Sequence, residues 1–188
     1  MEKSKYCETC KEMNCTKTEG VADMGEMKPS CYKTETRPSK DEYYIGIAEA
    51  ALERSTCLRR KYGAVLVKND KIVGTGYNGS PRGEENCCDI GYCEREAQNV
   101  PKGERYELCI SVHAEDNAIT HAGYDNANGG TLYIVGKNVA DGSYANPCPC
   151  TMCRRKIVNT GVKRVVGLFF NPDTGAKEIK DITVKLKE

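Results

Sequence analysis

The order of helix and strand signals along this 188-residue chain predicts an α/β fold, in which helices pack on a mixed sheet. Three observations lead to this expectation. A capped amphipathic helix comes first, runs rich in β-branched residues then alternate with helical stretches, and the later helices begin and end at recognisable residues. The resulting order is α-β-β-α-β-α-β-β. The length suits one domain with a substantial core.

The first expected elements are a helix and a hairpin. Ser39 and Glu42 form the pattern of a capping box, which opens a helix whose apolar positions are Ile45, Ile47, Ala48, Ala51 and Leu52. The runs 63–67 and 71–77 predict two strands joined by a short turn, and therefore a hairpin. Residues 79–110 carry several cysteines and are too long for a simple connection within a compact domain.

Helices and strands alternate in the second half of the chain. One helix is expected from about residue 113 to a stop near Gly123, and another has Pro149 in its first turn and ends at Gly161. Strands are expected at 131–135, at 163–170 and near 178–186. Two helices interleaved with these strands would pack on one sheet.

Composition narrows the classes of function. The net charge of +1 gives no strong field for nucleic acid or an anionic membrane, and the apolar runs are too short to span one. The polar start of the chain, its length and its C-x-x-C spacings suggest that the 12 cysteines serve a reducing cytoplasm and metal sites. We expect a cysteine-containing extension at 1–38 and one catalytic domain at 39–188.

Two short stretches carry the chemistry: His113-Ala-Glu115 and Pro149-Cys150-x-x-Cys153. One imidazole and two thiolates supply three zinc ligands and leave a fourth position for water, as in catalytic zinc sites. The two cysteines are three residues apart at a helix start, so both face one side and their thiols ionise more easily. Glu115 is close enough to transfer protons without being a ligand. A structural zinc finger would use the same cysteines, but it would require four ligands and no Glu115.

Together these stretches are the signature of zinc-dependent deaminases of nucleobases. Further segments make the resemblance more specific: CLRRKYGAV from Cys57, GTGYNGSPRG from Gly74, Asn86-Cys87-Cys88, and HAEDNAI from His113 resemble deoxycytidylate (dCMP) deaminases. The resemblance implies a three-layer α/β/α cytidine-deaminase-like sandwich with a mixed central sheet. It also implies hydrolytic deamination of dCMP to dUMP with a zinc-activated water, in which Glu115 acts as the proton shuttle.

The same resemblance suggests contacts to the substrate. The residue matching Asn78 is expected to hydrogen-bond the sugar, and the loop with Ser80 and Arg82 is expected to lie near the phosphate. A plain turn is the alternative for Asn78. Phe170 is the candidate for an aromatic pocket wall, and His121 is expected to be a packing or pocket-wall residue.

Further metal sites are also implied. Some relatives carry a structural zinc, for which the set here would be Cys57, Cys88, Cys93 and Cys109, with Cys87 as the competitor of Cys88. Reduced cysteines that pack as small hydrophobic residues are the alternative. Cys148 receives no metal role. A third zinc site is one interpretation of the N-terminal cysteines, and an ill-ordered tail is the alternative; these cysteines are Cys7, Cys10, Cys15 and Cys31.

Family members are often hexamers that dCTP activates and dTTP inhibits, so a cytoplasmic homo-oligomer with allosteric effectors is expected. Two other functions remain open. One is deamination of another cytosine nucleotide, a nucleoside or a base in RNA, although the near-neutral charge disfavours nucleic acid. The other is a competence-associated zinc-binding interaction protein without catalysis. No membrane partner is expected.

Overall fold

A computed structural model describes residues 37–101 and 104–183, and Pro38–Glu188 form one compact unit. Its centre is a five-stranded sheet of order β2-β1-β3-β4-β5. β3 and β4 are parallel and the other neighbours are antiparallel, so the sheet is mixed as predicted. The strands are β1 (Arg60–Lys68), β2 (Lys71–Tyr77), β3 (Thr131–Asn138), β4 (Arg164–Phe170) and β5 (Lys177–Asp181).

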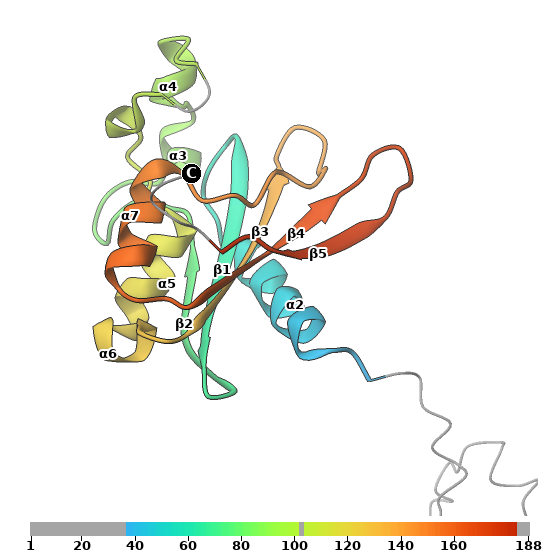
Figure 1. Ribbon diagram of the computed structural model, residues 1–188. Coiled ribbons are helices and arrows are strands. Elements are labelled where there is room, and N and C mark those ends of the chain that lie inside the picture. The colour runs from blue at the N-terminus through green and yellow to red at the C-terminus, as the bar shows by residue number, and fades with distance from the viewer. Residues whose placement is uncertain (1–36, 102–103, 184–188) are drawn as a thin grey trace, which may run out of the picture. The chain divides into compact units, whose positions relative to one another are not determined.

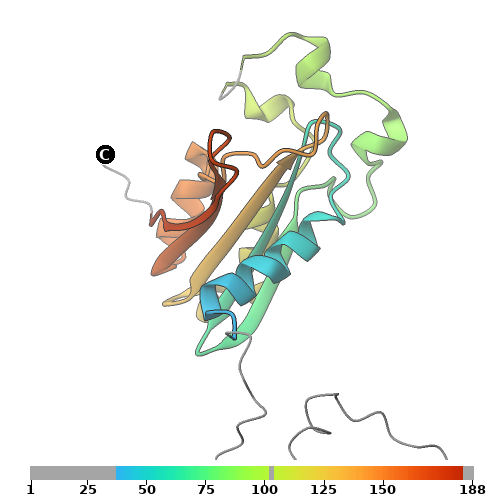
Figure 2. The same ribbon diagram turned by 90° about the vertical axis from the view of Figure 1, so that its right-hand side faces the viewer.

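Helices cover both faces of the sheet, which confirms the three-layer α/β/α architecture (Figures 1 and 2). One core joins α2 to the sheet, and a second core joins α5, α6 and α7 to the opposite face. The helices are α2 (Lys40–Leu52), α3 (Cys87–Ile90), α4 (Glu94–Ala97), α5 (Ala114–Ala122), α6 (Tyr124–Ala127) and α7 (Thr151–Asn159), with the 3-10 turn η1 (Tyr106–Leu108). Within the described residues, no helix is long and apolar enough to cross a membrane.

Most expected elements form, with shifted ends. Ser39 caps α2 in a complete capping box, and the 71–77 strand and its hairpin partner pair as expected. The prediction for Pro149 was wrong, because Cys150 is the N-cap of α7 and the proline therefore precedes the helix. The last strand ends at Asp181, five residues before its expected end at 186. The short helix α6 was not expected from the sequence.

Glycines let the helices approach the sheet closely. A Cβ added at Gly76 on β2 would lie 2.2 Å from the carbonyl oxygen of Ala114 on α5. On the opposite face, a Cβ at Gly63 on β1 would lie 2.0 Å from the carbonyl oxygen of Ala48 on α2. Any larger side chain would push the helix away from the strand. The missing side chain at Gly76 therefore sets the distance between α5 and the sheet. It thereby also sets the position of His113, which precedes α5.

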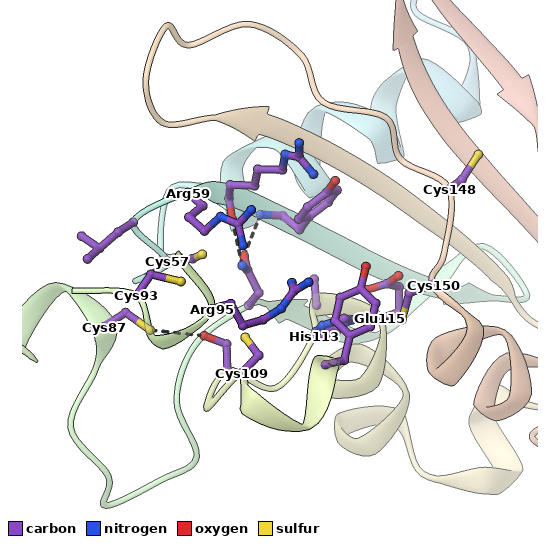
Figure 3. A pocket seen from close by; sticks show the side chains of 17 residues that line it. Cys57, Arg59, Cys87, Cys93, Arg95, Cys109, His113, Glu115, Cys148 and Cys150 are labelled. Carbon is purple, nitrogen blue, oxygen red and sulfur yellow. Dashed lines mark hydrogen bonds between the residues drawn. The ribbon is translucent and has the colours of Figure 1, made fainter. Parts of the chain in front are cut away.

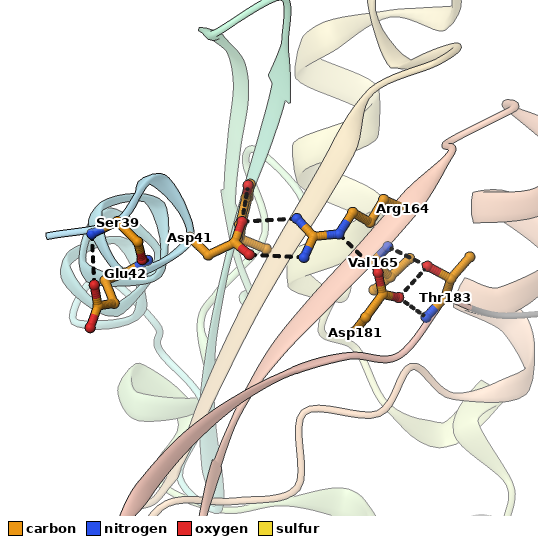
Figure 4. A network of polar contacts seen from close by, with 8 residues as sticks. Ser39, Asp41, Glu42, Arg164, Val165, Asp181 and Thr183 are labelled. Atoms are coloured by element: carbon orange, nitrogen blue, oxygen red, sulfur yellow. Dashed lines mark hydrogen bonds and ion pairs between the residues drawn. The ribbon is translucent and has the colours of Figure 1, made fainter.

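A polar network ties the start of α2 to three strands (Figure 4). Asp41 accepts two hydrogen bonds from the Arg164 guanidinium, at 2.9 and 2.8 Å, and a third from the Tyr133 hydroxyl. The Nε of Arg164 donates to Asp181 at 2.8 Å. These bonds hold the pKa of Asp41 below its ordinary value, chiefly through the hydrogen bond from Arg164.

The cysteine-bearing segment is closed at its base by a two-stranded bridge. Gly79 and Val112 exchange backbone hydrogen bonds of 3.2 and 2.8 Å, so the chain leaves the sheet and returns at the same point. The bridge places His113 beside Asn78 although 35 residues separate them in the sequence. Between its ends the segment holds three short helices, α3, α4 and η1, instead of the single loop that was expected.

Candidate active site

Two helix starts meet on one face of the sheet. His113 is the N-cap of α5, Cys150 is the N-cap of α7, and Cys153 lies one turn further along α7. Because α7 connects the parallel strands β3 and β4, its N-terminus lies at the carboxyl end of β3, where open α/β sheets bind their ligands. The apolar residues that follow on both helices share one core, which fixes the two starts relative to each other.

The three side chains have the spacing of zinc ligands. The Nδ1 of His113 lies 3.4 Å from the sulfur of Cys150 and 3.3 Å from that of Cys153. A tetrahedral zinc with Zn–S of about 2.3 Å and Zn–N of about 2.0–2.1 Å would separate nitrogen and sulfur by roughly 3.6 Å. Within the described part of the chain, this is the only set of three or more such ligand atoms that all lie within 4.8 Å of one another. The residues therefore fit a tetrahedral zinc.

The two thiols also behave as a metal-binding pair. Hydrogen bonding, first from Cys153 and then from His113, lowers the pKa of the Cys150 thiol to about 4. The pKa of Cys153 is raised, chiefly by its hydrogen bond with Cys150 and then by burial. The pair therefore favours a thiolate at Cys150 and a protonated thiol at Cys153 when no cation is bound. A divalent cation offsets the charge of two thiolates, so this donor set suits one.

Glu115 lies in the first turn of α5 and its side chain is buried, with the residue only 7% exposed. Burial raises the pKa of its carboxyl group, while the nearby His113 opposes the shift. The carboxylate is not in the set of ligand atoms but lines the same cavity. A carboxyl group beside a metal site and outside its ligands is placed to exchange protons.

A cavity opens in front of these residues (Figure 3). Two tyrosines, Tyr62 and Tyr106, contribute to its wall. The Tyr106 ring meets the His113 ring edge-on, with centroids 5.4 Å apart. Sequence reasoning missed Tyr106, and it also missed three arginines of the wall, Arg59, Arg60 and Arg95. Arg59 and Arg60 belong to the CLRRKYGAV segment that resembles dCMP deaminases, but no role was predicted for them, and no motif marks Arg95 or Tyr106.

Asn78 lies on the cavity wall, as expected from the sequence, but most of its side chain is already bonded. Its Oδ1 accepts from the Ser55 hydroxyl and the Tyr62 amide, both at 2.7 Å, and its Nδ2 donates to the Arg60 carbonyl at 2.9 Å. One amide N–H remains. Ser80, in contrast to its predicted role, does not line the cavity; its hydroxyl is buried and has no hydrogen-bond partner among the described residues.

Three other expectations differ from the structure. Arg82 is exposed and does not line the cavity. Phe170 is also absent from the wall, because the end of β4 carries its ring to Tyr144, with centroids 5.8 Å apart. His121 is exposed, and its Nδ1 lies 2.6 Å from the carbonyl oxygen of Thr75 on β2, so it is neither a core residue nor a wall residue.

The cysteines of the segment between Asn78 and His113 group differently from the set predicted from the sequence. Cys57, Cys93 and Cys109 line the cavity as a group, but their fourth member is Cys87 and not the predicted Cys88 (Figure 3). Cys87 is buried at the start of α3, and burial raises the pKa of its thiol. Cys88 is the next residue of the helix, so it points elsewhere; it is exposed and its sulfur lies 3.6 Å from Asp89.

Cys148 is exposed and lines the cavity, outside the group of close ligand atoms. The third zinc site predicted for Cys7, Cys10, Cys15 and Cys31 falls outside the described residues. The eight cysteines that the structure describes are all free thiols, in agreement with metal sites or a reduced core.

The fold and site define a zinc-binding deaminase domain, and comparison with known proteins agrees. The chain belongs to the cytidine and deoxycytidylate deaminase family, because the model of its zinc-binding region matches residues 38–168. The deoxycytidylate deaminase of Mycobacterium phage D29 is 39% identical over 136 residues, which cover 70% of this chain and 95% of the phage protein.

The fungal relatives are longer. The deoxycytidylate deaminase of Schizosaccharomyces pombe is 39% identical over 130 residues, which are 69% of this chain but only 37% of the yeast protein. The chain also covers 38% of its counterpart in Saccharomyces cerevisiae. Among solved structures, the dCMP deaminase of cyanophage S-TIM5 is 29% identical, with a TM-score of 0.48 over 70% of this chain and 83% of that chain.

Proposed function

We propose that this protein deaminates dCMP to dUMP and ammonia, in deoxynucleotide metabolism of the cytoplasm. The observation that carries the proposal is a buried carboxyl group, Glu115, beside a His–Cys–Cys set with zinc spacing in one cavity. Relatives named deoxycytidylate deaminase, 39% identical over most of this chain, support the choice of substrate.

In this proposal His113, Cys150 and Cys153 hold the zinc, which when bound lowers the pKa of water toward neutrality. Glu115 takes a proton from the attacking water and gives it to N3 of cytosine, so that C4 becomes electrophilic. The water oxygen forms a bond with C4. Glu115 then takes the remaining proton from the new C4 hydroxyl and delivers it to the amine. The C4–N bond breaks as the C4=O bond forms, so ammonia leaves and dUMP remains. The carboxyl group ends in the protonation state in which it began.

Residues on the wall orient the substrate. The remaining amide N–H of Asn78 is the polar group that we assign to the sugar. Tyr106 stands edge-on to His113 and forms an aromatic boundary for the base. The Tyr106 and His113 rings, together with the core of the sheet, exclude bulk water from the reacting atoms.

Ammonia release from a panel of dCMP, CMP, deoxycytidine, dCTP and an RNA hairpin tests the substrate. We expect selective turnover of dCMP. Faster ammonia release from another compound of the panel would make that compound the substrate in place of dCMP. If the zinc-loaded protein released ammonia from none of them, a zinc-binding interaction protein would be favoured.

Glu115→Gln tests the proton transfer. The variant should keep its zinc and lose about 10²- to 10⁴-fold in kcat, the range for a general acid–base group. Asp116→Asn, on the same turn of α5 but paired with Lys156, is the matched control and should retain turnover. Normal turnover by the Glu115 variant would remove this residue from the mechanism.

We propose a second, structural zinc on Cys57, Cys87, Cys93 and Cys109. Its support is that three of these thiols perturb the pKa of the fourth, Cys87, and that all four line one wall. The sulfurs do not lie within 4.8 Å of one another as the ligand atoms of the first site do, so zinc would draw the segment inward. Such a metal would order the long segment between Asn78 and His113.

The zinc content per chain distinguishes the two arrangements of cysteines. In the full chain, Cys87→Ala should lose one zinc ion relative to the wild type, and Cys88→Ala should lose none. Loss of zinc by the Cys88 variant alone would restore the assignment made from the sequence. A wild-type content of one would eliminate the second site.

The remaining family expectations are proposals of the same kind: a homo-oligomer, with a hexamer as its expected form, that dCTP activates and dTTP inhibits. Exposed apolar side chains on α6 and α7, Tyr124, Met152 and Val158, support a contact between subunits. Sedimentation with and without the two nucleotides, together with dCMP turnover, tests both parts. A monomer whose rate neither nucleotide changes would contradict them.

A further inference from the structure

The cavity wall carries an excess of positive charge. Three arginines line it, Arg59, Arg60 and Arg95, against the single carboxylate of Glu115. Arg59 is ion-paired with Glu96 at 2.8 Å. Within the described ranges 37–101 and 104–183, neither Arg60 nor Arg95 has a carboxylate partner.

Arg95 on α4 is the most unusual of the three, because it is 7% exposed. Its Nη2 donates to two backbone carbonyls, those of Pro101 at 3.0 Å and Glu104 at 2.6 Å. Its Nε has no hydrogen-bond partner among the described residues. Carbonyl oxygens do not neutralise a charge, and a buried cation without a counter-ion is strongly disfavoured. The site therefore favours an anion that enters from the cavity.

Arg95 is close to the reacting centre. Its guanidinium carbon lies 4.6 Å from the centroid of the Tyr106 ring, and that ring is 5.4 Å from the ring of His113. In Figure 3 Arg95 lies between the cysteine group and the pair His113 and Glu115. The Tyr106 ring thus lies between Arg95 and His113. A molecule whose reactive ring lies at His113 could therefore place an anionic group at Arg95.

Arg60 adds a second cation on the same wall. It lies at the start of β1, and its Nε donates to the neutral Oδ1 of Asn138 at 3.1 Å. Its backbone carbonyl accepts from Asn78, the residue assigned above to the sugar. A sugar held by Asn78 would thus lie beside the backbone of Arg60, and the side chains of Arg60 and Arg95 contribute to the lining of the same cavity. Planar guanidinium groups bind phosphate oxygens through paired hydrogen bonds, which suits a terminal phosphate.

We infer that Arg95, assisted by Arg60, binds the phosphate of the substrate and selects a nucleoside monophosphate over the nucleoside. This inference rests on the proposed deaminase function. Phosphate recognition is thereby assigned to Arg95 in the cysteine-bearing segment. The sequence had suggested Arg82 for this role, but Arg82 is exposed and outside the cavity. Arg95 is a specificity residue for the phosphate and takes no part in proton transfer.

The test compares dCMP with deoxycytidine in the full-length, zinc-loaded protein. Arg95→Gln should lower kcat/KM for dCMP about 10- to 100-fold, the range for hydrogen bonds to a charged group, and leave the value for deoxycytidine unchanged. Arg95→Lys should recover part of the loss. Arg105→Gln is the control, because Arg105 lies in the same segment, is exposed and pairs with Glu107. It should change neither value.

Binding of the product gives a second readout that needs no turnover. Calorimetry should show weaker binding of dUMP by Arg95→Gln and unchanged binding of deoxyuridine. If this variant fails to fold, Arg60→Gln provides the same comparison. Equal losses with both ligands would mean that Arg95 only supports Tyr106 and the loop, and unaltered dCMP kinetics would also overturn the inference. A wild-type protein inactive on dCMP would instead refute the proposed function.

Discussion

Two arginines illustrate how the two ends of this molecule differ. Arg164, on β4, is about a third exposed and has both edges of its guanidinium bonded to carboxylates, those of Asp41 and Asp181. Arg95, on α4, is buried; within the described part of the chain its hydrogen-bond partners are two carbonyls, it packs on the Tyr106 ring, and its Nε is unpaired. The less buried arginine is thus the better neutralised one.

This difference has a physical meaning. A guanidinium that the fold has already paired contributes to stability and has little capacity left for a ligand. A buried guanidinium without a counter-ion destabilises the fold, and an incoming anion offsets that cost. We therefore expect variants near Arg164 to change unfolding and not turnover, and variants of the cavity to change turnover more than unfolding.

The largest effect is expected at the zinc ligands. Cys150→Ala removes one of three ligands at the N-cap of α7, so the variant should lose the catalytic zinc and all measurable deaminase activity. Zinc content and ammonia release measure the two losses together. Cys148→Ala, two residues earlier and exposed, should retain both. Activity in a zinc-free Cys150 variant would separate the metal from the reaction.

A stability effect should come next, at the contact between β2 and α5. Gly76→Ala places a Cβ 2.2 Å from the Ala114 carbonyl, so it should lower the free energy of unfolding by about 1–3 kcal/mol. It should also reduce turnover, because α5 carries Glu115. Thermal and chemical unfolding measure the change. Gly46→Ala, on the open side of α2, should instead stabilise the protein by roughly 0.5–1 kcal/mol. Similar results for both glycines would refute the close-approach argument.

The smallest effect is expected at the paired arginine. Asp41→Asn weakens the bonds to Arg164, and since both side chains are about a third exposed, the loss should be about 1 kcal/mol or less at neutral pH. Turnover should not change. Asp173→Asn, in the exposed turn before β5, is the control and should leave stability unaltered.

This small effect should depend on pH in a defined direction. The pKa of Asp41 is lowered in the folded protein, so the ionised carboxylate stabilises the fold above its unfolded pKa of about 4. The stabilisation disappears as the pH falls through the lower folded pKa. Urea titrations at several pH values should therefore show the wild type and Asp41→Asn converging in acid. A constant difference across the acid range would contradict the role of the charge.

Local sequence alone determined the elements and the metal ligands. The capping box at Ser39, the hairpin runs and the stop at Gly123 depend on neighbouring residues, so the pattern contains the information. The motif around His113 and Cys150 is recognisable for a similar reason, because zinc requires fixed ligand types at fixed spacing on helix starts.

Only the tertiary structure decided which side chains share the cavity. Cys87 and Cys88 are adjacent and chemically identical. The orientation of the short helix α3 decides which thiol is buried and which is exposed. Arg95 has no motif, and its significance comes from burial without a counter-ion. Phe170 fails as a wall residue because β4 carries its ring to Tyr144. Burial and pairing depend on residues distant in the sequence, so local patterns cannot specify them.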